Sequence, residues 1–187
     1  AFYFVADYHA LTSIRDPELM RRWSYEITAY FLAFGLNPNQ ATFFRQSDVP
    51  EVCELQWLLT CITSMGLLDR AHAWKAAKDR GEEGASVHGL FAYPVLMAAD
   101  ILIYDSDVVP VGKDQIQHVE MTRDMAERFN HLFGETFKLP EAQVAAAVGT
   151  IPGTDGRKMS KSYDNTLVLM QPPKKLRKQV MQIVTDS

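Results

Sequence analysis

The sequence predicts an α/β fold built on a doubly wound parallel sheet. Short apolar runs of strand type alternate along the chain with segments whose apolar residues recur every three or four positions. Such alternation is typical of parallel strands joined by helices. Glycine and proline stand at the boundaries between these segments. The 187 residues are 47% hydrophobic and 22% charged, which indicates a globular domain.

Local signals place the first strand and helix. Residues 2–6 are an apolar run of strand type. Asp16-Pro17 then supplies an N-cap and a first-turn proline, which begin a helix that continues to about Phe34. Gly35 ends this helix, because glycine readily adopts the backbone conformation that follows a helix C-terminus.

A second strand is expected over 41–44. Pro50 begins a helix that continues to about Lys78, with an interruption near Gly66. The polar run over 79–84 is expected to be a loop, because it carries two glycines and four charged residues. The first half of the chain therefore has the order strand, helix, strand, helix.

The second half repeats this alternation and ends with a long loop. A largely apolar helix is expected over 90–104, a short buried strand over 107–112 and a helix over 114–132. Residues 142–163 lose all periodicity, and loops of that length are often functional. A last helix is expected over 173–184. No repeat or linker divides the chain, so we expect 1–187 to be a single domain.

Composition narrows the class of protein. No apolar run reaches the roughly 18 residues of a membrane span, so we expect no membrane partner and, by default, a cytoplasmic location. Cys53 and Cys61 fit neither a disulfide framework nor a zinc site, so we expect two buried thiols and no bound metal. The net charge of −4 excludes nucleic-acid binding over the whole surface, so any such contact must be local, at 157–161 or 174–178.

Two lysines three residues apart lie in the long loop, within the string Lys158-Met159-Ser160-Lys161-Ser162. Their ammonium groups can neutralise a polyphosphate, and nearby glycines let the backbone close on it. Two lysines alone are equally compatible with a solvated basic loop. The five-residue string decides between the two, because its chance occurrence in a chain of this length is roughly one in ten thousand.

The string resembles the KMSKS signature of the class I aminoacyl-tRNA synthetases, whose ATP-binding fold is a doubly wound parallel sheet. This resemblance implies that Lys158 and Lys161 hold the ATP phosphates and stabilise the charge on the departing pyrophosphate. It also implies that Met159 and Ser160 contact ATP.

Gly112, Asp114 and Gln115 stand where a predicted strand meets a helix, which is where open parallel sheets bind ligands. From the residues alone, Asp114 is equally an N-cap. The Gly-x-Asp-Gln pattern resembles the ATP and amino-acid contact shared by the tryptophan and tyrosine enzymes. The following residues, 117–130, are similar to the tryptophan branch.

Tyr93, Met97 and Asp100 share one face of the predicted apolar helix, because they are spaced four and seven residues from the first. An acid in such a stretch needs a partner, which is either a neighbouring helix or a ligand. The indole N–H of tryptophan is a suitable ligand donor, since it can only donate.

The segment 93–100 resembles the tryptophan-tRNA synthetases, in which the aspartate receives the indole N–H and the methionine packs against the ring. The resemblance implies that Tyr93 and Gln115 hold the α-amino group. It further implies a wall around the ring and a nearby histidine, namely Val5, Ile101, Val109, Val111 and His9. A histidine satisfied by the loop backbone remains an equal alternative for His9.

The resemblance covers nearly all of the chain and predicts activation of L-tryptophan by ATP with Mg²⁺, followed by transfer to tRNA(Trp), with no tightly bound cofactor and as a homodimer. The His-x-Gly-His-like string of class I enzymes does not occur in these residues. We therefore expect a partial catalytic domain that lacks the first strand and helix and is inactive alone, with the helix over 173–184 leading toward an anticodon-binding region. A tyrosine enzyme and a non-catalytic ligand-binding module remain alternatives.

Overall fold

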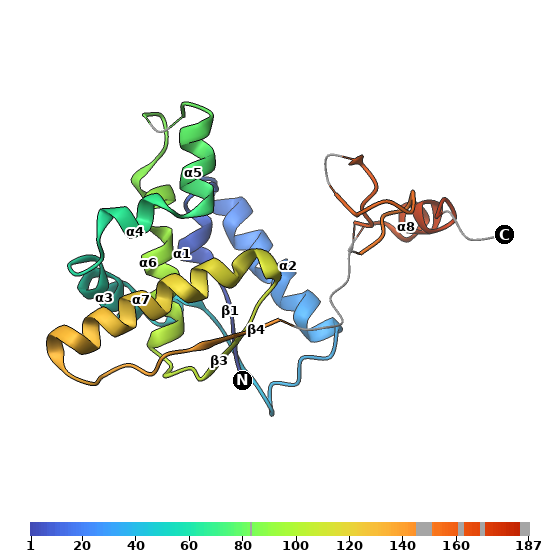
Figure 1. Ribbon diagram of the computed structural model, residues 1–187. Coiled ribbons are helices and arrows are strands. Elements are labelled where there is room, and N and C mark those ends of the chain that lie inside the picture. The colour runs from blue at the N-terminus through green and yellow to red at the C-terminus, as the bar shows by residue number, and fades with distance from the viewer. Residues whose placement is uncertain (83, 145–150, 161–162, 169–170, 184–187) are drawn as a thin grey trace. The chain divides into compact units, whose positions relative to one another are not determined.

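The computed structural model shows the chain as two compact units, 1–143 and 144–187, which are described separately (Figure 1). The described residues are 1–82, 84–144, 151–160, 163–168 and 171–183.

Four strands pair in parallel in the first unit. Strand β1 (Phe2–Val5) pairs with β2 (Thr42–Arg45), and β3 (Val108–Pro110) pairs with β4 (Glu141–Gln143). Helices lie between the paired strands along the chain, which confirms the predicted α/β class with parallel strands. In the part of the chain that the structure describes, the strands form two sheets of two strands each.

The helices agree closely with the sequence pattern. The helix Pro17–Ala33 begins as predicted, because the carboxylate of Asp16 accepts hydrogen bonds from the backbone N–H of Glu18 at 2.9 Å and of Leu19 at 3.2 Å. It is followed by Gly35 at φ +96°. The helical elements are α1 (Asp7–Ala10), α2 (Pro17–Ala33), η1 (Gln46–Asp48), α3 (Glu51–Thr60), α4 (Met65–Asp69), α5 (His72–Asp79), α6 (His88–Leu102), η2 (Lys113–Gln115), α7 (Ile116–Phe133) and, in the second unit, α8 (Pro173–Val180).

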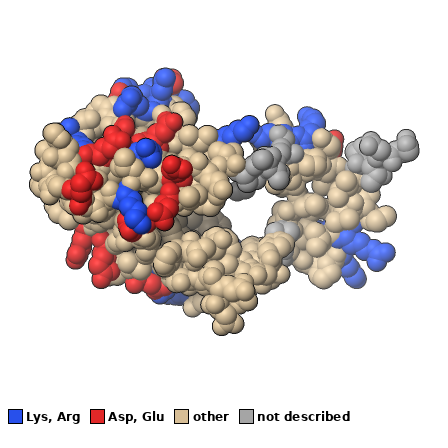
Figure 2. All heavy atoms as spheres, turned by 60° about the horizontal axis from the view of Figure 1, so that its bottom comes forward, with Lys and Arg blue, Asp and Glu red and all other residues tan. Residues whose placement is uncertain are grey.

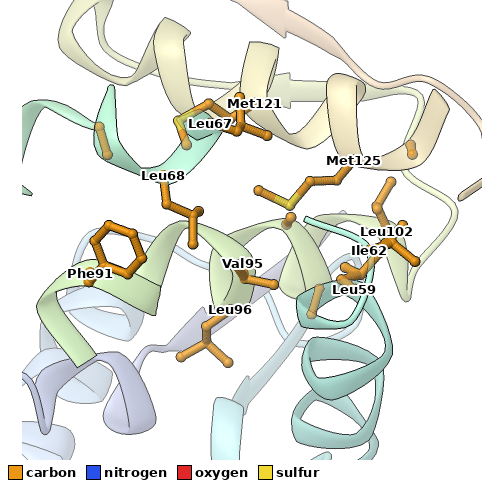
Figure 3. Close-up of a cluster of buried hydrophobic side chains, with 14 of the residues drawn as sticks. Leu59, Ile62, Leu67, Leu68, Phe91, Val95, Leu96, Leu102, Met121 and Met125 are labelled. Carbon is orange, nitrogen blue, oxygen red and sulfur yellow. The ribbon is translucent and has the colours of Figure 1, made fainter. Parts of the chain in front are cut away.

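The core of the first unit is built around α6, which is apolar on all sides. Its Val95 is fully buried, and it packs against Leu59 of α3 and Met125 of α7 (Figure 3). Since a helix that is apolar all round must be covered on all sides, α3, α4, α5 and α7 all pack against it. The positions of the buried side chains on α6 are therefore set by packing.

The strand predictions need two corrections. The strand over 107–112 was expected to be buried, but Val108 is 47% exposed, because a two-stranded sheet leaves one side open to solvent. The loop was expected to begin at residue 142, but β4 extends to Gln143. Its three side chains are exposed, so only its backbone pairing with β3 defines it as a strand, and no apolar alternation reveals it.

The helix predictions need three further corrections. The break expected near Gly66 lies earlier, since α3 ends at Thr60 and α4 begins after Ser64, whose side chain accepts from the N–H of Leu67. Helix α8 ends at Val180, four residues before the predicted end, which lies outside the described residues. Both cysteines are exposed, because the face of α3 that enters the core carries Val52 and Leu59 instead.

Among the described residues, no helix combines the length and the apolar character that crossing a bilayer requires.

The packing of α3 generates the first test. Leu59 is fully buried, whereas its neighbour Leu58 is 54% exposed, so the pair provides a matched control. Leu59→Ala should lower the free energy of unfolding by about 2–5 kcal/mol, because the cavity cannot close completely. Leu58→Ala should change it by about 0.5 kcal/mol or less. Urea unfolding of both variants measures the difference, and equal effects would show that α3 does not dock as described.

Candidate active site

Asp100 is a buried carboxylate in the apolar helix α6, with 8% of its surface exposed. Burial raises its pKa to about 7, and a hydrogen bond from Gln46 acts in the opposite direction. Its hydrogen-bond partner comes from the short 3-10 helix η1, so the predicted alternative of a hydrogen bond between helices describes this contact, and the ligand role of Asp100 stays a prediction. Asp100 is therefore a strong acceptor held in an apolar setting.

Gln46 is the partner that sequence reasoning missed. Its side-chain Nε2 donates to both carboxylate oxygens of Asp100, at 2.9 and 2.7 Å, and its Oε1 accepts from the backbone N–H of His9 at 3.1 Å. The residue is 1% exposed although it follows an exposed arginine. An amide at the end of a predicted strand gave no signal of its own, since its partners lie 37 and 54 residues away.

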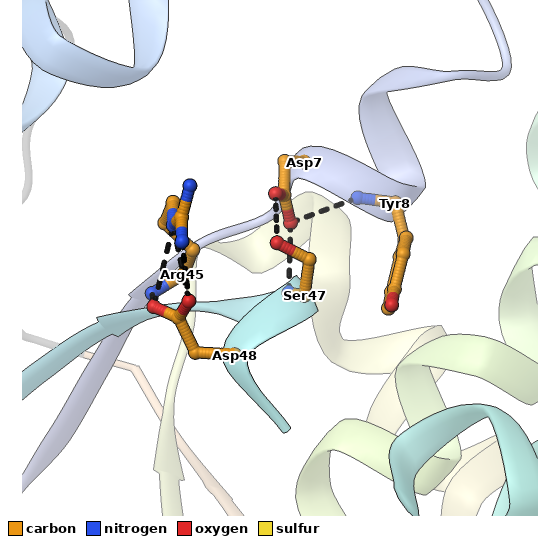
Figure 4. A network of polar contacts seen from close by, with 5 residues as sticks. All are labelled: Asp7, Tyr8, Arg45, Ser47 and Asp48. Atoms are coloured by element: carbon orange, nitrogen blue, oxygen red, sulfur yellow. Dashed lines mark hydrogen bonds and ion pairs between the residues drawn. The ribbon is translucent and has the colours of Figure 1, made fainter. Parts of the chain in front are cut away.

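Asp7 ties the start of α1 to η1 (Figure 4). Its carboxylate accepts from the backbone N–H of Ser47 at 3.0 Å and from the Ser47 hydroxyl, while Arg45 and Asp48 form an ion pair across the same short turn. Gln46 lies between these two anchored positions. The backbone on both sides of Gln46 is therefore held by contacts that do not involve Asp100.

Tyr93, one of the predicted α-amino contacts, lies between two histidines. Its hydroxyl is 3.2 Å from Nε2 of His118, and its ring meets His9 edge-on at 5.1 Å between ring centroids. Burial lowers the pKa of His118, with smaller effects from His72 and His9, and so favours a neutral ring that can accept the Tyr93 hydroxyl proton. Such an arrangement leaves the oxygen lone pairs of Tyr93 available to a cationic ligand group.

The structure brings three of the predicted site residues together, namely His9, Tyr93 and Asp100: Gln46 joins His9 to Asp100, and the His9 ring contacts Tyr93. A cavity of about 390 Å³ is lined by Tyr93, with Tyr8 of α1 and Leu96 of α6, but Asp100 and His9 are not among its lining residues. His9 is half-buried, and burial lowers its pKa. The His9 backbone N–H donates to Gln46, and its ring contacts Tyr93.

The predicted ring-wall residues lie on three elements. Met97 and Ile101 are half-buried on α6, and Val5 is buried at the end of β1. Val109 in β3 and Val111 just after it are also half-buried. These side chains have the apolar character and partial exposure that a ring-binding wall requires.

The Gly112 to Gln115 segment forms η2, directly before α7. Helix α7 begins at Ile116 and its N-cap position is Gln115, so Asp114 is not the N-cap that the alternative interpretation proposed. The Asp114 carboxylate is exposed and accepts from Nε2 of Gln115 at 3.1 Å. A Cβ at Gly112 would lie 2.7 Å from that carboxylate, so a larger residue there would require the exposed Asp114 side chain to move.

The signature loop lies in the second unit and is organised by Asn165, which is 2% exposed. Its Nδ2 donates to Asp155 at 2.7 Å and to the backbone oxygen of Lys158 at 3.1 Å, and its Oδ1 accepts from the N–H of Ser160 at 2.8 Å. A Cβ at Gly153 would lie 2.3 Å from the Asn165 side chain. This close approach accounts for that glycine.

The hydrogen bonds of Asn165 also affect the pKa of an acidic residue in the loop. The hydrogen bond from Asn165 holds the pKa of Asp155 at about 2, and Arg157 acts in the same direction. Lys158 is exposed, and Met159 and Ser160 are half-buried. Lys161, the other predicted phosphate contact, lies outside the described residues. Sequence reasoning missed Asn165, whose position five residues after Ser160 carries no helical or strand periodicity.

These groups can bind an aromatic amino acid and a polyphosphate, since they include a buried acceptor, a hydroxyl flanked by imidazoles and an exposed lysine on a glycine-containing loop. In the described part of the chain, no cluster of three His, Cys, Asp or Glu side chains could hold a metal ion.

Comparison with known families shows which family the chain belongs to. A family model described as "tRNA synthetases class I (W and Y)" matches residues 1–187. The chain belongs to this synthetase family. The resemblance predicted from the motifs at 93–100, 112–130 and 158–162 is therefore confirmed at the level of the family.

Individual relatives of this synthetase chain are tryptophan–tRNA ligases. That of Pseudomonas aeruginosa is 56% identical over 196 residues, covering 100% of this chain and 44% of the relative. That of Rhodopirellula baltica is 57% identical over 186 residues, covering 100% of this chain and 58% of the relative. The chain thus spans about half the length of these relatives.

Solved structures agree with the fold. The tryptophanyl-tRNA synthetase of Campylobacter jejuni, complexed with ADP and tryptophan, matches with a TM-score of 0.89 and 53% identity, over 98% of this chain and 57% of that one. A tyrosyl-tRNA synthetase of Archaeoglobus fulgidus matches with a TM-score of 0.73 at 20% identity, over 97% of this chain and 55% of that one, and shares the fold. The class I synthetase fold is confirmed.

The buried carboxylate should limit the stability of the protein. The pKa of Asp100 is raised from 3.8 to about 7, so the folded state holds a proton that the unfolded chain releases between these values, and stability falls as pH rises through this window. Asp100→Asn should therefore raise the free energy of unfolding at pH 8 by about 3 kcal/mol, allowing for one lost hydrogen bond, and have little effect at pH 4. Urea unfolding at both pH values tests this expectation, and a gain that did not grow with pH would contradict it.

Proposed function

We propose that the protein activates L-tryptophan with ATP and transfers it to tRNA(Trp). The observation that carries this proposal is Asp100, a buried carboxylate with unused acceptor capacity on a helix that also presents Tyr93 and Met97. The indole N–H is a donor without acceptor capacity, so a carboxylate in an apolar wall suits it. The tryptophan–tRNA ligases that share 54–57% of its residues support the same choice of amino acid.

In the proposed reaction, a carboxylate oxygen of tryptophan attacks the α-phosphorus of ATP. A new P–O bond forms as the bond to the β-phosphate oxygen breaks, giving tryptophanyl-adenylate and pyrophosphate. A ribose hydroxyl at the end of tRNA then attacks the activated carbonyl, and AMP leaves. No protein nucleophile takes part, so positioning and charge neutralisation supply the acceleration.

Each group has a proposed role. Tyr93 and Gln115 hold the α-amino group, and Val5, Ile101, Val109, Val111 and Met97 enclose the ring, with His9 beside Tyr93. Gly112 and Asp114 contact ATP, and Lys158 and Lys161 neutralise its phosphates with Met159 and Ser160. Magnesium enters as the substrate complex of ATP, and no tightly bound cofactor is proposed.

Contact with tRNA is proposed for α8 in the second unit. Its four exposed cations, Lys174, Lys175, Arg177 and Lys178, are well suited to phosphates. Figure 2 shows Lys and Arg on this unit, and Lys and Arg interspersed with Asp and Glu on the visible face of the first unit. We further propose a homodimer in the cytoplasm, which rests on the family resemblance.

Asp100 should decide which amino acid is activated. Asp100→Ala should reduce the preference for tryptophan over phenylalanine greatly, since a site built on such a hydrogen bond rejects the analogue that lacks the donor by on the order of ten-thousandfold. ATP–pyrophosphate exchange by the full-length protein with tryptophan, phenylalanine and tyrosine measures this preference. Asp107→Ala, at a carboxylate whose side chain is 79% exposed, is the control. Unchanged discrimination in Asp100→Ala, or faster exchange with tyrosine than with tryptophan in the parent protein, would refute the proposal.

Lys158 should act on the transition state, because charge on pyrophosphate grows only as the bond breaks. Lys158→Ala should lower kcat for adenylate formation by on the order of a hundredfold, with a smaller change in KM for tryptophan. The control is Lys138→Ala, at a surface lysine paired with Asp105 at 3.0 Å, which should leave both constants unchanged. A loss confined to the KM for ATP would show ground-state binding instead.

A further inference from the structure

Gln46 is the hydrogen-bond partner of Asp100 and is 1% exposed. Both polar atoms of its amide form hydrogen bonds. Nε2 donates to the two carboxylate oxygens at 2.9 and 2.7 Å, and Oε1 accepts from the His9 N–H at 3.1 Å. A rotated amide would set Oε1 against the carboxylate and Nε2 against the N–H. Only one orientation of the amide therefore satisfies both neighbours.

The amide connects three elements that are distant in sequence. His9 lies in α1, Gln46 begins η1, and Asp100 lies near the end of α6. The backbone beside Gln46 is anchored independently, because Ser47 is held by the carboxylate of Asp7 (Figure 4). The donor is thus delivered to Asp100 by a prearranged turn rather than by a freely rotating side chain.

The carboxylate keeps room for a ligand after Gln46 has bound it. An ionised carboxylate offers about four lone-pair sites, and Nε2 of Gln46 occupies two of them. The remaining sites can accept one N–H of a ligand. A hydrogen bond to the charged form also favours ionisation, and the ionised form is the stronger acceptor.

We propose that Gln46 is a positioning residue for tryptophan selection, which holds the Asp100 carboxylate in one orientation and favours its ionised form, so that it can receive the indole N–H. This inference rests on the proposed function, because it requires that Asp100 is the indole acceptor. Residue identity at position 46 matters for a physical reason. Leucine would leave a buried carboxylate without its donor, and glutamate would set a second negative charge against it.

Gln46→Leu is the principal variant, and Gln117→Leu is its matched control. Gln117 also bridges elements through its amide, donating to the backbone oxygen of Arg70 at 3.0 Å and accepting from the N–H of His72 at 3.3 Å. Each variant is assayed in the full-length protein by ATP–pyrophosphate exchange. The two substrates are tryptophan and its benzothiophene analogue, in which sulfur replaces the indole N–H.

Gln46→Leu should raise the KM for tryptophan about ten- to a hundredfold, as expected for a hydrogen bond to a charged group. Its effect on the analogue should be within about threefold, because the analogue has no N–H for Asp100 to accept. Gln117→Leu should leave the ratio of the two KM values unchanged. Equal losses for both substrates in Gln46→Leu would assign Gln46 a merely structural role and overturn the proposal.

The pH dependence of tryptophan affinity is a second measurement, which a purely structural role of Gln46 would leave unchanged. Affinity for tryptophan should fall in the parent as pH drops through about 7, the pKa of Asp100, and this acidic limb should move to higher pH in Gln46→Leu. The other titratable groups near Asp100 are His9 in α1, Cys53 in α3 and Tyr104 after α6. Burial raises the pKa of Cys53 and Tyr104, and the Asp100 charge adds to it.

Gln46→Glu should reverse this pH dependence. Glutamate can donate a hydrogen bond to Asp100 only when it is protonated, so the affinity for tryptophan should rise as pH is lowered from 8. Failure of this inference is distinguishable from failure of the proposed function. If Asp100→Ala changes the ratio between tryptophan and the analogue while Gln46→Leu keeps the ratio and pH limb of the parent, the positioning role is overturned and the function stands. If Asp100→Ala also leaves the ratio unchanged, both fall.

Discussion

The burial of one carboxylate in an apolar helix is the constraint on which the candidate site depends. Asp100 lies on α6, a helix covered on all sides, where an ionised group loses most of its hydration. The donor from Gln46 offsets part of that cost, and the raised pKa shows that part remains. Such a carboxylate is available to a ligand donor in a way that a well-hydrated surface acid is not, because burial limits the access of water to its lone pairs.

The same helix explains why the site can be specific. Tyr93 and Asp100 are both on α6, whose packing against α3 and α7 leaves little freedom for either side chain. Rigid elements hold binding groups more accurately than loops do. The short turn that carries Gln46 is the exception, and it is fixed instead by polar contacts to Asp7 and by the Arg45–Asp48 pair.

The signature loop is stabilised in a different way. None of its described residues belongs to the buried apolar cluster, and hydrogen bonds that converge on Asn165, with the close approach of Gly153, shape the described part of the loop. Its lysine remains exposed, as a group must be if it is to meet a phosphate. In the proposed reaction, the residues that select the amino acid are thus held by packing. The residues that meet the phosphates are held by hydrogen bonds to the backbone.

The sequence by itself determined the alternation of strands and helices, the α2 cap at Asp16, the parallel α/β class and the family, because periodicity, capping residues and contiguous motifs are local properties. The tertiary structure alone decided that Cys53 and Cys61 are exposed and that β3 is partly exposed and paired with β4. It also decided that the partners of the predicted residues are Gln46, His118 and Asn165. Those partners lie up to 54 residues away, and no local pattern marks an amide or an imidazole whose role depends on what the fold brings to it.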